Sequence, residues 1–289
     1  MPTQGSQMNT SGPPEPPIGV FDSGVGGLSI LRQLRLQLPG EDFLFFADQA
    51  HVPYGPRPLA EVREFSVAIA RFLLDQRAKL IVVACNTASA AALHHLRRTF
   101  PEVPFVGMEP AVKPAAETTR TRRVGVLATP ATFQGELFAS VVERFAGGVE
   151  VLPLTLPGLV EQIERGDLED PTTRAMVESA LRPLLHQGVD TLVLACTHYP
   201  FVIPLIEDIA GPGVRVIDPS PAIARQVSRL LAEGGLRSGR EAGGQLTLIS
   251  SADGDSLLRM ARQLIAADGV PATARWSHGR LSLTVPPPE

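Results

Sequence analysis

The chain has 289 residues and a mass of 30.8 kDa, a length that suits one large or two smaller domains. Hydrophobic residues make up 44% of the sequence and charged residues 19%, which excludes a mainly disordered, collagenous or coiled-coil protein. The net charge of −4 argues against nucleic acid as the main partner, and every apolar run is far shorter than the ~20 residues of a membrane span. With no signal-peptide pattern either, we expect a soluble cytoplasmic protein with no membrane partner.

In chain order, residues 1–16 are rich in Pro, Gly, Ser, Thr and Gln, and this composition predicts a disordered leader. From Pro17 onward, short β-branched or aromatic runs alternate with longer stretches of helical periodicity, which predicts an α/β fold. The predicted strands are 18–22, 43–48, 80–84, 104–108, 123–128, 149–154, 191–195, 214–217, 245–250 and 281–285. The predicted helices are roughly 26–38, 58–77, 87–99, 110–119, 133–146, 157–165, 171–187, 200–210, 219–233 and 254–266. The runs at 80–84 and 191–195 are apolar at every residue, which is typical of central parallel strands covered on both faces.

The chain also repeats itself. Residues 19–23 resemble 125–129, and residues 81–87 resemble 192–198 at a similar offset and in the same order. We therefore expect two pseudo-symmetric α/β domains with mainly parallel sheets flanked by helices, and an active site in the cleft between them. The expected bounds are 17–111 plus 218–289 for the first domain and 112–217 for the second.

The chain contains two cysteines, Cys85 and Cys196, and each follows one of the repeated strands. A single buried cysteine is usually a packing residue, but two at matched strand ends favour a function. Thiols on opposite sides of a cleft suit a reaction in which one thiolate removes a proton from carbon and the other thiol delivers one, inverting a stereocentre. A redox pair would need the sulfurs at bonding distance, and a zinc site would need more ligands than cluster here, so both are weaker alternatives.

Other polar residues lie at the same strand ends. The glycine-rich stretch 22–27 follows the first strand and opens a helix, which predicts an anion site for a phosphate or a carboxylate. Asp22 either orients or deprotonates Cys85 or caps that helix, and His198 can stabilise a thiolate at Cys196. Nearby threonines either donate hydroxyls to a ligand or cap helices: Thr87, Thr129, Thr132 and Thr197.

Four motifs in order, at 19–28, 53–55, 84–88 and 195–200, resemble those of the glutamate racemases in the aspartate/glutamate racemase family. The resemblance spans about residues 17–232. It implies interconversion of L- and D-glutamate without pyridoxal phosphate or metal, with two cysteines as the acid/base pair, and a supply of D-glutamate for peptidoglycan. It also implies a possible homodimer.

By the same resemblance, Cys85 takes the α-proton from D-glutamate with help from Asp22, and Cys196 takes it from L-glutamate with help from His198. Glu164 resembles a further acidic residue near the site. The implied substrate contacts are Asp22, Ser23, Tyr54, Gly55, Asn86, Thr87, Thr197 and His198, to which we add the hydroxyl of Thr132.

The sequence departs from the family pattern at two places. Ala131 stands where the family usually has glycine, and Leu156 stands where it usually has cysteine. The two lysines, Lys79 and Lys113, are poorly placed to hold pyridoxal phosphate as a Schiff base, which agrees with the expected lack of a cofactor. The alternatives that stay open are an aspartate racemase or related amino-acid isomerase, and a non-catalytic anion-binding protein.

Overall fold

The computed structural model describes residues 15–284, so most of the predicted leader lies outside the described residues. The strands are β1 Ile18–Asp22, β2 Phe43–Ala47, β3 Leu80–Val83, β4 Phe105–Gly107, β5 Arg123–Ala128, β6 Glu150–Leu154, β7 Thr191–Ala195, β8 Arg215–Ile217, β9 Leu246–Ser250, β10 Val270–Ser277 and β11 Arg280–Leu283. The helices are α1 Leu28–Gln37, α2 Leu59–Asp75, α3 Asn86–Thr99, α4 Val112–Thr118, α5 Pro130–Gln134, α6 Glu136–Phe145, α7 Leu159–Arg165, α8 Pro171–His186, the 3₁₀ turn η1 Tyr199–Val202, α9 Ile203–Ala210, α10 Ser220–Glu233 and α11 Gly254–Ile265. None of the helices in the described part of the chain is both long and apolar enough to span a bilayer.

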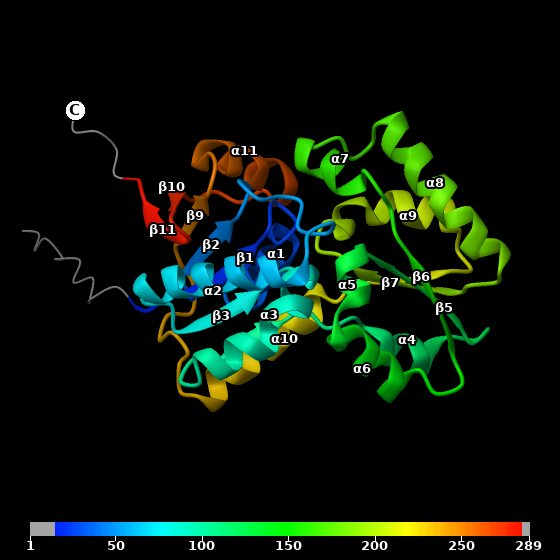
Figure 1. Ribbon diagram of the computed structural model, residues 1–289, viewed down its shortest axis with the longest axis horizontal. Helices are drawn as coiled ribbons and strands as arrows, with labels where there is room; N and C mark the ends of the chain where they lie inside the picture. The colour runs from blue at the N-terminus through cyan, green and yellow to red at the C-terminus, as the bar shows by residue number, and fades with distance from the viewer. Residues whose placement is uncertain (1–14, 285–289) are drawn as a thin grey trace, which may run out of the picture.

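The strands form two sheets that lie side by side (Figure 1). The first sheet has the order β11-β10-β9-β2-β1-β3-β4, and the second has the order β6-β5-β7-β8. Among the described strands every pairing is parallel except that of β10 with β11. The prediction of a two-domain α/β fold with mainly parallel sheets is therefore confirmed.

The sequence repeat has a structural counterpart. The order β2-β1-β3-β4 in the first sheet matches β6-β5-β7-β8 in the second. Strands β1 and β5 thus occupy equivalent places, as do β3 and β7, which are the strands that precede the two cysteines. Because parallel strands end at the same edge of a sheet, each cysteine comes to the edge where an α/β sheet binds its ligands.

Helices cover the first sheet on both faces, which explains why its central strands are apolar except for Asp22 at the end of β1. Ile18 and Val20 of β1 pack into one core with residues of α1, α10 and α11. Phe21 of the same strand points to the other face and packs against α2 and α3. All three side chains are fully buried, and such burial on both faces is the main stabilising contribution of a parallel sheet.

The chain passes between the two sheets twice, after β4 into α4 and after β8 into α10. Strands β9, β10 and β11 then extend the first sheet at the edge of β2 (Figure 1). The residue bounds expected for the two domains stay predictions.

Two elements differ from the sequence prediction. The helix expected at 133–146 is broken into α5 and α6, because Gly135 adopts an extended conformation (φ −74°, ψ 139°). A Cβ there would lie 2.6 Å from Cβ of Ala90, so the break lets α3 approach closely. Strand β10 was missed, and the last strand ends at Leu283; residue 285 of its predicted range lies outside the described residues.

Candidate active site

Both thiols line one cavity of ≈ 220 Å³ between the two sheets. Cys85 lies two residues beyond β3 and caps α3, where its Sγ accepts a hydrogen bond from the backbone N–H of Ala88 at 3.4 Å. Cys196 directly follows β7 and precedes the turn η1. The two residues are 5% and 6% exposed, so the cavity holds one buried thiol from each domain.

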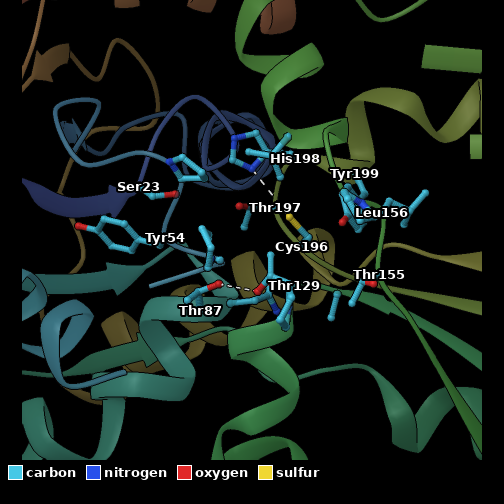
Figure 2. A pocket seen from close by; sticks show the side chains of 18 of the residues that line it. Ser23, Tyr54, Thr87, Thr129, Thr155, Leu156, Cys196, Thr197, His198 and Tyr199 are labelled. Carbon is cyan, nitrogen blue, oxygen red and sulfur yellow. Dashed lines mark hydrogen bonds between the residues drawn. The ribbon is translucent and has the colours of Figure 1, made fainter. Parts of the chain in front are cut away.

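The cavity gathers most of the residues predicted for the site (Figure 2). The predicted residues that line it are Ser23, Tyr54, Gly55, Cys85, Asn86, Thr87, Cys196, Thr197 and His198. Asp22, Thr132 and Glu164 are not among the lining residues and contact those that are.

Several lining residues were not predicted for the site. They are Pro53, Pro56, Ala128, Pro130, Thr155, Leu156, Pro157, Gly158, Val160, Glu161 and Tyr199. Tyr199 lies within the motif at 195–200 and could have been included, while Thr129, one of the candidate hydroxyl donors, also lines the cavity. The segment 155–158 and Glu161 carry no residue pattern that points to a ligand, so only the fold reveals them.

Asp22 sits behind Cys85 at the end of β1. Its Oδ2 accepts the backbone N–H of Gly27 at 2.6 Å, and the hydroxyl of Thr197 lies 3.5 Å from the same oxygen. Complete burial raises the pKa of the Asp22 carboxyl. Burial, and then the neighbouring Asp22 carboxylate, raise the pKa of Cys85 well above that of an ordinary thiol, so the free site favours the protonated form.

Cys196 has a different partner. Its Sγ lies 3.8 Å from Nδ1 of His198, and Nε2 of His198 lies 2.6 Å from Oε1 of Glu164 (Figure 2 draws the first contact). Burial alone would lower the pKa of His198, but the hydrogen bonds to Cys196 and Glu164 outweigh it and raise the pKa well above its usual value. An imidazolium in this place can stabilise negative charge on the sulfur or share its proton.

Two backbone amides of the glycine-rich stretch 22–27, which the sequence predicts to be an anion site, are bound by carboxylates of the protein itself. The N–H of Val25 donates to Oε1 of Glu164 at 2.8 Å, and the N–H of Gly27 donates to Oδ2 of Asp22. The anions at these two amides are therefore carboxylates of the protein itself. A Cβ at position 24 would lie 1.9 Å from Oε1 of Glu164, and one at Gly26 would lie 2.5 Å from Nδ1 of His198. The glycines therefore make room for side chains of the second domain.

Polar groups from both domains meet on the other side of the cavity. The Thr87 and Thr129 hydroxyls are 2.8 Å apart, and Thr132 lies behind them, 2.9 Å from Thr129 (Figure 2 shows the first pair). The Asn86 side chain is 3% exposed, and among residues 15–284 neither its amide nitrogen nor its oxygen has a hydrogen-bond partner. Such an amide is suited to bind a polar ligand, because an unpaired buried group is costly.

Ala131, which replaces the glycine expected from the resemblance, is buried and contacts the first domain. The backbone N–H of Ala131 donates to the carbonyl oxygen of Gly55 at 3.3 Å, and its side chain is 2% exposed. The alanine methyl is thus packed without loss of this contact between the domains.

The lysines lie away from the cavity. Lys79 precedes β3 at the end opposite to Cys85 and pairs with Glu41 at 2.6 Å. Lys113 lies in α4, and neither lysine is among the lining residues. Within residues 15–284, no group of three or more His, Cys, Asp or Glu side chains is arranged as a metal site.

Comparison with known proteins identifies a family that the chain resembles. Residues 18–227 match the family model described as Asp/Glu/Hydantoin racemase. A glutamate racemase from Roseiflexus sp. (strain RS-1) is 49% identical over 249 residues, which cover 86% of this chain and 92% of that protein. A solved glutamate racemase isoform from Bacillus anthracis has a TM-score of 0.83 at 28% identity and covers 91% of this chain and 98% of its own. The Francisella tularensis glutamate racemase, solved in complex with D-glutamate, has a TM-score of 0.78 at 29% identity and covers 90% of this chain and 97% of its own.

Proposed function

The chain belongs to the Asp/Glu/Hydantoin racemase family, and from that premise we propose that it interconverts L- and D-glutamate by a two-cysteine acid/base mechanism. That it is an amino-acid racemase follows from the family and from relatives of about half-identical sequence. Glutamate as substrate is supported by the activity of those relatives and by the neighbour solved with D-glutamate.

The observation that carries the mechanism is the pair of buried thiols on one cavity. Cys85 and Cys196 come from matched strands of two similar domains, so they approach the cavity from opposite sides. Inversion of a carbon centre needs a base on one face and an acid on the other, and this arrangement supplies both.

In the direction from L to D, the Cys196 thiolate removes the α-proton and becomes a thiol. The Cα–H electron pair stays on the substrate as a carbanion. The Cys85 thiol then donates its proton to the opposite face of that carbon and becomes a thiolate. In the direction from D to L the same steps run backward, with Cys85 as the base.

The surroundings of the two thiols fit these roles. His198 beside Cys196 offers a positive partner for a thiolate, while the Asp22 carboxylate beside Cys85 favours the thiol. The unpaired amide of Asn86 and the hydroxyls of Thr87 and Thr129 are placed to bind the polar groups of the amino acid. Fixed dipoles in a closed cavity stabilise a developing carbanion, which is usually the largest single contribution to catalysis.

The first test is proton NMR of L- and D-glutamate in D₂O with reduced enzyme and no added cofactor. We expect the product enantiomer to carry deuterium at Cα while the remaining substrate keeps its proton early in the reaction, because each thiol serves one face. Deuterium appearing equally fast in the remaining substrate would contradict the two-base mechanism. Faster exchange of aspartate than of glutamate would assign the substrate to aspartate instead.

Cys85→Ala and Cys196→Ala test the two sulfurs one at a time. Each change is expected to lower kcat/KM in both directions by about a thousandfold or more, since general acid/base groups contribute on that scale. Calorimetric titration with D-glutamate shows whether each variant still binds. A wild-type protein that binds glutamate without any exchange would support the anion-binding alternative.

We further propose that the D-glutamate serves peptidoglycan synthesis in the cytoplasm. The test is growth of a D-glutamate-requiring bacterium that carries this gene on medium without D-glutamate. Growth with the wild type and none with Cys85→Ala is the expected result. A homodimer remains a prediction, which light scattering of the purified protein can test.

A further inference from the structure

A buried carboxylate lies behind the wall of the cavity, and the proposed mechanism does not use it. Asp48 directly follows β2 and is fully buried, yet within residues 15–284 no lysine or arginine forms an ion pair with it. A buried charge of this kind has to be held by hydrogen-bond donors.

The donors to Asp48 come from two parts of the chain. Oδ2 accepts the hydroxyl of Tyr54 at 2.6 Å. Oδ1 accepts the hydroxyl of Ser251 at 2.8 Å and the indole N–H of Trp276 at 2.7 Å. Nδ1 of His51 lies 3.1 Å from Oδ1 and 3.0 Å from Oδ2. One carboxylate thus joins the cavity wall to the C-terminal part of the first sheet.

We call residues 48–57 the substrate loop, because Tyr54 and Gly55 line the cavity. The hydroxyl of Tyr54 is engaged by Asp48 and points away from Cys196 (Figure 2). Tyr54 therefore faces the cavity with its ring, and the position of that ring depends on Asp48. On the opposite domain, Ala131 donates its N–H to Gly55, so the loop also contacts the second domain.

Aromatic packing adds to the hydrogen bonds. The ring of His51 stacks on Phe65 with centroids 4.0 Å apart, and Trp276 lies 5.1 Å from His51 and 5.7 Å from Phe65. Trp276 belongs to β10, the strand that pairs with β9 at the extended edge of the first sheet. Both Ser251 and Trp276 lie beyond the segment matched by the family model, which ends at residue 227.

We propose that Trp276 is a positioning residue for the substrate loop and acts through Asp48. Its indole N–H fixes the carboxylate that holds Tyr54 and His51, and its ring supports Phe65 and His51 from behind. The part of this inference that concerns substrate affinity rests on the proposed racemase function. The part that concerns the order of the loop does not.

The test compares hydrogen exchange of backbone amides in the wild type and three variants. Trp276→Phe keeps an aromatic ring but removes the N–H. Ser251→Ala removes the second donor to Oδ1 and also the acceptor of the Ala50 N–H, so Trp276→Phe is the variant that tests Asp48 alone. Arg275→Ala is the matched control, because this exposed residue precedes Trp276 on the same strand. Within the loop, the backbone N–H of His51 donates to the carbonyl oxygen of Asp48, and that of Arg57 donates to the carbonyl oxygen of Tyr54. The exchange rates of these two amides therefore report on the order of the loop.

We expect these two amides to exchange about tenfold faster in Trp276→Phe and Ser251→Ala, because a hydrogen bond to a charged group is lost. Amides of β1 and β3 should exchange as in the wild type. The proposal would be overturned if the loop amides in Trp276→Phe exchanged no faster than those in Arg275→Ala. Equal acceleration in β1 and β3 would overturn it as well, because the effect would then be a general loss of stability.

A kinetic measurement on the same variants tests the consequence for substrate. Trp276→Phe is expected to raise KM for both glutamate enantiomers about tenfold with kcat changed less than about twofold, since the thiols are untouched. A fall in kcat with KM unchanged would contradict the positioning role. A wild type without racemase activity would refute the proposed function, and the exchange measurement would still decide the role of Trp276 in the loop.

Discussion

The two thiols are chemically alike but have neighbours of opposite charge. Burial, and then the neighbouring carboxylate of Asp22, raise the pKa of Cys85, whereas Cys196 lies beside the imidazole of His198. Protonation is therefore favoured at the sulfur of Cys85, while the imidazole of His198, whose pKa is raised, lies beside Cys196. Under the proposed mechanism, a protonated Cys85 is the state needed for conversion of L-glutamate to D-glutamate.

The charge of His198 depends on Glu164, and this gives a prediction for one residue. Glu164→Gln keeps a hydrogen-bond partner but removes the negative charge that helps raise the pKa of His198, so that pKa should fall. An NMR titration of the imidazole measures the change directly. Glu161→Gln, on the same helix, serves as the control. An unchanged pKa in Glu164→Gln would show that Cys196 alone raises it.

The same shift affects stability. Because the pKa of His198 is raised in the folded state, its protonation stabilises the fold fully below the unfolded value, which is about 6.5. That contribution is lost as the pH rises through the folded pKa. In Glu164→Gln this contribution should be smaller and should be completely lost at lower pH than in the wild type, which unfolding in urea at a series of pH values can detect.

At the scale of elements, the turn between β1 and α1 fits the second domain closely. Gly26→Ala would place a methyl group 2.5 Å from Nδ1 of His198 and 2.7 Å from Oγ1 of Thr197. Displacement of His198 by about an ångström is expected to lower kcat/KM about a hundredfold. Gly147→Ala is the control, because no heavy atom lies within 4 Å of a Cβ there. Steady-state kinetics that match in both variants would contradict this account.

The start of β7 is fixed by a carboxylate outside the active site. Asp190 accepts hydrogen bonds from the Thr119 hydroxyl and from the backbone N–H groups of Arg120 and Thr121, at 2.5, 2.7 and 3.0 Å. Burial alone would raise the pKa of Asp190, but these donors lower it to about 2. The segment before β5 is thereby joined to the strand that carries Cys196.

Because this pKa is lowered, the ionised carboxylate stabilises the fold above the unfolded value near 3.8. Asp190→Asn should therefore cost about 2 kcal/mol of unfolding free energy at neutral pH. The difference from wild type should shrink as the pH falls through the range from about 4 to about 2. Urea unfolding checks both expectations, with exposed Asp208→Asn as the control. A difference that persists at low pH would contradict the assigned cause.

The elements also show what the sequence could predict. The central strands and both cysteines were placed correctly, because their apolar runs and the repeat are local patterns that parallel topology brings to one edge. The break at Gly135 depends on Ala90, and strand β10 depends on pairing with β9, which are contacts with residues outside each local segment. The cavity wall at 155–158 and the contact of Trp276 with Asp48 could not be predicted either, because they too depend on contacts between distant segments of the chain.

At the scale of the whole molecule, the chemistry requires both domains at once. L- and D-glutamate are enantiomers with equal free energies in water, so kcat/KM has to be the same in the two directions. A change on one side of the cavity, such as His198→Asn, should therefore lower both values by the same factor. Initial rates measured from each enantiomer test this. Unequal factors would mean that the reaction is not a simple racemisation.

The close fit of residues 24–27 against Glu164, Thr197 and His198 also limits how the protein can be recombined. A chimera that takes its first domain from one racemase and its second from another joins two halves shaped for different partners. The hybrid keeps its active geometry only if this turn and the three facing side chains come from the same parent. Crossover points chosen only at the two connections between the sheets would separate them, so libraries built by exchanging domains should inherit these residues as one block.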